Sequence, residues 1–124
     1  MNLQLLLKVN GVVSGINGLS AILMYNMWFN MAGLEATGPT IALCQSLGVA
    51  AVGLAIISWR TASIAGDAIN SYGQLFAYIH SLFVLLTLYQ LMKGYFPNQQ
   101  PAYFNLIESL ILAAAFFYYS RKTE

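Results

Sequence analysis

The stretch Thr40–Trp59, TIALCQSLGVAAVGLAIISW, contains no charged residue, and Arg60 follows it directly. A helix of these 20 residues would be about 30 Å long, which is the thickness of the hydrocarbon core of a bilayer. Three other apolar stretches of similar length occupy residues 3–25, 71–92 and 103–119. We therefore predict an all-α, multi-pass membrane protein in which residues 1–124 form a single transmembrane domain, an antiparallel four-helix bundle.

The composition of the 124-residue chain also favours a location in the lipid bilayer. Charged residues make up 7% of it, whereas about a quarter is usual in a soluble domain. Hydrophobic residues make up 59%, and the mean hydropathy is +0.66. A net charge of +1 provides no basic face for nucleic acid, so we expect the lipid bilayer and other membrane proteins as partners. The single cysteine, Cys44, cannot form an internal disulfide and is interpreted as a packing residue.

The basic residues predict an orientation in the membrane. Four of the five lie near the termini or in the connection after the second span: Lys8, Arg60, Arg121 and Lys122. Only Lys93 lies at the opposite boundary. Under the positive-inside rule both termini are cytoplasmic, and we expect a bacterial cytoplasmic membrane. The first outer loop is itself apolar around Trp28 and Phe29, so we expect it to lie along the membrane surface as a short interfacial segment.

Small residues predict how the spans pack, because helices associate in lipid through close contact and hydrogen bonds. Each span carries a stripe of small or polar residues: Gly11, Gly15 and Gly18 beside Asn10, Ser14 and Asn17; Cys44, Gly48, Ala51 and Ala55 beside Gln45; Gly73, Ala77, His80, Val84 and Thr87; and Asn105, Glu108, Ser109 and Leu112. We expect these stripes to face one another inside the bundle. The alternative for Gly11 and Gly15 is a dimerisation face.

Ionisable groups within the membrane are candidate functional residues, because their burial is costly unless they are paired or neutral. Glu108 lies in the outer half of the fourth span, at a depth similar to that of Gln45. Thr87 and Gln90 lie near the outer end of the third span, and Asn17 of the first span is a little deeper. Three roles are open for this polar layer. It fixes the register of the helices, it forms the polar floor of a ligand pocket that opens outward, or it relays protons.

His80 lies deeper, near the middle of the third span, with Tyr78 and Ser81 beside it. Asn10 and Ser14 of the first span fall at a comparable depth. The histidine is either a hydrogen-bonded packing residue, a ligand to a haem or chlorin metal, or a hydrogen-bond donor to a quinone. The chain has no second histidine to complete a six-coordinate haem.

The whole layout resembles the small four-helix bacterial membrane proteins called DoxX-like. The second span, CQSLGVAAVGLAIISWR (Cys44–Arg60), carries the likeness through Gln45, Gly48, Gly53 and Trp59, although the group more often has arginine at the position of Gln45. Some members look like membrane subunits of oxidoreductases that handle thiols, sulfur compounds or quinones. The four-helix EXPERA proteins, which hold a ligand pocket with acidic residues, are a more distant likeness.

These observations leave three functional hypotheses. The first is a non-catalytic accessory or structural subunit of a larger membrane assembly, since no hydrolase, metal-binding, thiol-redox or phosphate-loop motif is present. The second is a binder or carrier of a small hydrophobic molecule such as a quinone, sterol-like lipid or isoprenoid. Its candidate ligand-binding residues are Glu108, Gln45, Asn17, His80, Tyr78 and Thr87, with Phe76 and Phe83 as further walls. The third is a redox or pigment-associated subunit that uses His80. We assign no catalytic residue, no metal ligand and no cofactor.

Overall fold

The computed structural model describes residues 2–121, and within this range it contains only helices. Four of them are long and apolar enough to cross a membrane: α1 (Leu3–Leu23), α3 (Gly38–Ile64), α4 (Ile69–Lys93) and α5 (Gln100–Arg121). A short helix, α2 (Tyr25–Ala32), follows α1, and a single 3₁₀ turn, Gly66–Ala68, precedes α4. The prediction of an all-α, multi-pass membrane fold is therefore confirmed. Lys122, one of the basic residues used to predict the orientation, lies outside the described residues.

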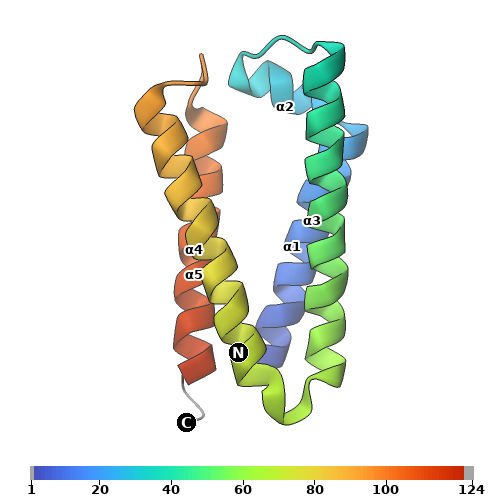
Figure 1. Ribbon diagram of the computed structural model, residues 1–124, viewed down its shortest axis with the longest axis vertical. Helices are drawn as coiled ribbons and strands as arrows, with labels where there is room; N and C mark the ends of the chain where they lie inside the picture. The colour runs from blue at the N-terminus through green and yellow to red at the C-terminus, as the bar shows by residue number, and fades with distance from the viewer. Residues whose placement is uncertain (1, 122–124) are drawn as a thin grey trace.

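The four long helices form two antiparallel pairs, α1 with α3 and α4 with α5 (Figure 1). The pairs meet at the end where α1 begins and α5 finishes, which we call the terminal end. They separate toward the opposite end, which carries α2 and which we call the α2 end (Figure 1). Because the four long helices alternate in direction, the start of α1 and the end of α5 lie at the same end of the molecule (Figure 1).

The hydrophobic core lies near the terminal end, where all four long helices contribute to it. Its buried members are Leu3, Leu6, Leu7, Ala62, Phe76, Ala77, Leu112 and Phe116. The rings of Phe76 and Phe116 stack with 5.5 Å between their centroids, which joins α4 to α5. Large apolar side chains elsewhere face outward, among them Leu47, Leu85 and Ile111. These faces contact the lipid bilayer, since lipid is the medium in which such side chains are stable.

Glycine allows α1 and α3 to approach closely. A Cβ atom built on Gly18 would lie 2.6 Å from the carbonyl oxygen of Gly48, and one built on Gly48 would lie 2.6 Å from that of Gly18. Gly11 approaches the Ala55 carbonyl in the same way, at 3.0 Å. The predicted small-residue contact between the first two spans is confirmed. Asn105, which the sequence placed on the buried stripe of the fourth span, is instead exposed.

The helices extend beyond several of the predicted bounds for local reasons. The second span was predicted at 40–59, but α3 begins at Gly38 and continues to Ile64. Thr37 and Thr40 form a capping box at its start, and Pro39 occupies the first turn, where its missing N–H costs nothing. Likewise, α5 begins at Gln100 rather than residue 103. The third span ends as predicted within one residue, because Gly94 adopts a left-handed conformation with φ of 65°.

The apolar segment after the first span is helical and crosses the α2 end of the molecule (Figure 1). It is fixed to α1 by a hydrogen bond of 2.8 Å from the Trp28 Nε1–H to the Ser20 hydroxyl. It is also joined to the connection between α4 and α5, because the Asn98 N–H donates to the Ala32 carbonyl at 3.0 Å. These two bonds connect the helix pairs at the end where the long helices separate.

Replacing Trp28 with phenylalanine should loosen α2 without changing the fold. The substitution keeps an aromatic ring but removes the donor to Ser20, so we expect backbone amides of α2 to exchange with deuterium about fivefold faster, which corresponds to one lost hydrogen bond of about 1 kcal/mol. Hydrogen–deuterium exchange of the detergent-solubilised protein measures this. The control is Trp59→Phe at the other end of the molecule. Equal exchange in both variants would show that this bond does not hold α2.

Candidate functional site

Two groups of polar side chains connect the helix pairs inside the membrane. The first is a buried chain of hydrogen bonds against the hydrophobic core, which we call the Asn10 network. The Asn10 Nδ2 lies 3.0 Å from the Ser58 hydroxyl, and the Asn10 Oδ1 lies 2.8 Å from the His80 Nε2. The Ser58 hydroxyl in turn donates to the Leu7 carbonyl at 2.6 Å. This network therefore joins α1, α3 and α4 through one asparagine.

The Leu7 carbonyl, the last acceptor in the Asn10 network, determines which group donates the hydrogen in each of its bonds. A carbonyl oxygen only accepts, so the Ser58 hydroxyl gives its hydrogen to Leu7 and accepts one from the Asn10 amide. The amide oxygen of Asn10 then faces His80, and the Nε2 of the imidazole carries the hydrogen between them. The His80 ring also stacks on Phe116 of α5, with 5.7 Å between centroids and 10° between planes. All four long helices thus contact this one cluster.

The second group consists of Asn17 and Glu108, which we call the Asn17–Glu108 link. The Nδ2 of Asn17 donates to the Oε1 of Glu108 at 2.9 Å and joins α1 to α5. Both side chains are half-buried. Asn17 lies seven residues beyond Asn10 on α1, so the link is about 10 Å nearer the α2 end than the buried network. Glu108 is eight residues from the start of α5, deeper than its place in the predicted helix implied.

Among residues 2–121, none of the other predicted ligand-binding residues forms a hydrogen bond with Glu108. Gln45 donates to the Ile22 carbonyl at 3.3 Å, so it fastens α3 to the last turn of α1. Tyr78 is 55% exposed on the outer face of α4, where its ring contacts Phe117 edge to face. Thr87 is buried two turns beyond His80 on α4. Within this predicted polar layer, Asn17 bonds directly to Glu108, whereas Gln45 bonds to the Ile22 carbonyl.

The proposed aromatic walls are also separated. Phe76 is buried in the core against Phe116, so its ring is already covered by this chain. Phe83 is about half exposed on α4. These positions do not form a continuous aromatic wall around Glu108.

Ser58 is the member of the site that the sequence does not single out as a candidate. The small-residue stripe on the second span runs through Cys44, Gly48, Ala51 and Ala55, and one further step of the helical period reaches Ser58. A hydroxyl is a weak signal, because serine is common among the small residues of helix interfaces in membranes. Its position at the end of the stripe was the available clue.

The described residues contain no group of three or more His, Cys, Asp or Glu side chains arranged to hold a metal ion. Comparison of the chain with protein-family models, with curated proteins and with solved structures finds no match. The fold and the polar clusters together define a helical integral membrane protein whose two helix pairs are joined by internal hydrogen bonds. The resemblance to DoxX-like proteins stays a prediction.

Proposed function

We propose that this protein is a non-catalytic accessory subunit of a larger membrane assembly. The observation that supports this most directly is the closed hydrogen bonding of the Asn10 network. Asn10, Ser58 and the Nε2 of His80 satisfy one another within the chain, and Asn10 is only 1% exposed. The deepest polar groups thus hold helices together, which is what a structural subunit requires of them.

We further propose that the terminal end faces the cytoplasm of a bacterial cell. Among residues 2–121, Lys8, Arg60 and Arg121 lie in helical turns near the terminal end, and Lys93 lies at the α2 end. This distribution supports the orientation through the positive-inside rule. The position of Trp28, which is bonded across the α2 end, agrees with an interfacial location for α2 on the outer side.

The test is native mass spectrometry of protein extracted from its own membrane in a mild detergent, with an absorption spectrum of the same sample. We expect one partner protein at a fixed ratio in two different mild detergents, and a colourless preparation. A chain that is always free of partners, or one that carries a haem or chlorin band, contradicts the proposal. The Asn10 bond to the Nε2 of His80 supports the colourless outcome, because ligation through that nitrogen would first have to break it.

One observation favours a second candidate, a binder of a small hydrophobic molecule. Glu108 is a half-buried carboxyl between the helix pairs, and the structure gives it one hydrogen bond among residues 2–121, through Oε1. A carboxyl with remaining acceptor capacity in an apolar setting suits a ligand that carries a hydroxyl or another donor. A quinol or an isoprenoid alcohol has this chemistry.

The substitution Glu108→Gln tests this second candidate. Glutamine has the same length and still accepts from Asn17 through its amide oxygen, so we expect unfolding to change by less than about 1 kcal/mol. A ligand that donates to the carboxyl should bind about tenfold more weakly, as measured by titration with a short-chain quinol and with farnesol. Gln45→Ala is the control, because Gln45 bonds to Ile22 rather than to Glu108. Unchanged binding in Glu108→Gln would exclude the carboxyl as an anchor.

A further inference from the structure

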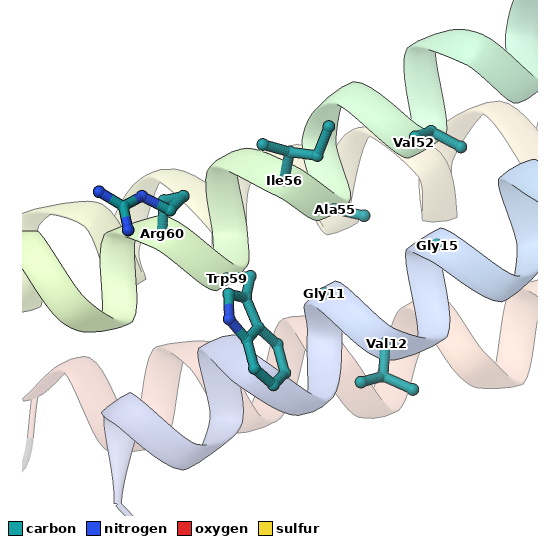
Figure 2. Close-up of a pocket in the computed structure, with 8 residues that line it drawn as sticks. All are labelled: Gly11, Val12, Gly15, Val52, Ala55, Ile56, Trp59 and Arg60. Carbon is teal, nitrogen blue, oxygen red and sulfur yellow. The ribbon is translucent and has the colours of Figure 1, made fainter.

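An apolar groove of about 360 Å³ runs along the surface between α1 and α3 (Figure 2). We call it the α1–α3 groove. It is lined by Gly11, Val12, Gly15, Val52, Ala55, Ile56, Trp59 and Arg60. Val12, Ile56 and Trp59 are each about half exposed, so the groove opens toward lipid. It is separate from both polar groups described above.

The groove exists because small residues form its floor. Gly11 and Gly15 contribute no side chain from α1, and Ala55 contributes a single methyl group from α3. A Cβ atom on Gly15 would lie 3.6 Å from that methyl group, an ordinary contact distance. Larger side chains on either edge, from Val12 and Ile56, then form the walls (Figure 2). The result is a surface groove whose lining is apolar apart from Arg60, as a hydrocarbon chain requires.

Positive charge is confined to one end of the groove. Arg60 lines the part of the groove that is nearest the terminal end of the molecule. It lies four residues before Ile64, where α3 ends. The Lys8 Nζ lies 5.6 Å from the centroid of the Trp59 ring, beside the same end. Figure 2 shows the Trp59 ring reaching from α3 to α1 next to Gly11. None of the eight lining residues is acidic, and both Lys8 and Arg60 are exposed.

We propose that the α1–α3 groove is a binding site for one anionic phospholipid. Its phosphate binds Arg60 and Lys8, and one acyl chain lies along the groove from Trp59 toward Val52. The layout of the site matches the layout of the ligand, with two exposed cations at one end and only apolar lining beyond them. Arg60 is about 6 Å from the end of α3, and arginine and lysine side chains are long enough to reach headgroup level from that depth.

Lipid titration tests the proposal directly. Purified protein in detergent is mixed with phosphatidylglycerol or with phosphatidylcholine of the same acyl chains, and bound lipid is counted by native mass spectrometry. We expect one phosphatidylglycerol per chain, bound at least tenfold more tightly than phosphatidylcholine. Each cation near a headgroup contributes about a fivefold factor, so Lys8→Gln with Arg60→Gln should weaken phosphatidylglycerol binding about 30-fold. Arg121→Gln, at the same end of the molecule but on α5, is the matched control.

A second pair of variants tests whether the acyl chain binds in the α1–α3 groove. Gly15→Leu places a side chain in the groove, whereas Gly53→Leu places one on α3 where no other atom lies within 4 Å of the new Cβ. We expect Gly15→Leu to remove binding of both lipids and Gly53→Leu to leave it intact. Equal affinity for the two lipids, unchanged binding in Gly15→Leu, or a dimer that forms through this face in place of bound lipid would each overturn the proposal.

Discussion

Asn10→Ala should lower the free energy of unfolding by about 2–4 kcal/mol, since it removes two buried hydrogen bonds and leaves the Nε2–H of His80 without an acceptor. Asn10 is the only residue that joins α3 to α4 in this network, because it bonds to Ser58 on one side and to His80 on the other. The loss should therefore appear as separation of the helix pairs as well as reduced stability. Reversible unfolding by dodecyl sulfate in mixed micelles measures the free energy.

The control for this substitution is Asn105→Ala, which removes the same side chain from an exposed position on α5. We expect it to change stability by less than about 0.5 kcal/mol. His80→Ala should cost as much as Asn10→Ala, and the double variant should cost much less than the sum, because both single changes break the same bond. Fully additive effects would show that Asn10 and His80 stabilise the protein independently of each other.

Gly18→Ala should destabilise the protein by about 1–3 kcal/mol, although alanine is the better helix former. The added methyl group would lie 2.6 Å from the Gly48 carbonyl and 2.8 Å from a methyl group of Val52. The first of these contacts is with backbone, so a rotamer change does not relieve it and α1 must move away from α3. Unfolding in mixed micelles, with thermal aggregation as a second readout, measures the effect.

Gly53→Ala provides a control of opposite sign. A Cβ atom there meets nothing within 4 Å, so only the helix preference of alanine remains, and we expect stabilisation of up to about 1 kcal/mol. The two glycines are alike in composition and differ only in what surrounds them. If both substitutions destabilise the protein to a similar extent, then Gly18 does not act by allowing α1 and α3 to approach closely.

The fold was predictable from sequence because hydropathy and length determine which segments cross a bilayer. The predicted span at 71–92 agrees with α4 within a few residues at each end. The pairing of Gly18 with Gly48 was accessible for a related reason, since small residues at helical spacing identify close contacts in lipid. Helix ends were less accessible, because the Thr37 cap extends α3 before its apolar stretch begins.

The candidate site was only partly predictable. Depth along each span can be counted from the sequence, and depth alone grouped Gln45 with Glu108 and His80 with Asn10. Rotation about each helix axis cannot be counted in that way. The rotation turns Gln45 toward the Ile22 carbonyl and Tyr78 toward lipid, whereas it turns His80 toward Asn10.

The Asn10 network also bears on the order in which the protein assembles as it is synthesised. The bonds from Asn10 to Ser58 and from Ser58 to Leu7 lie within the first two spans, so that hairpin can enter the membrane with these groups already paired. The Asn10 Oδ1 then has no partner until His80 arrives on the third span. Because the Asn10 Oδ1 lies at a fixed depth, the hairpin of α4 and α5 can pair His80 with it at only one position along the bundle axis. In this way a single amide would select the alignment of the two halves during biogenesis.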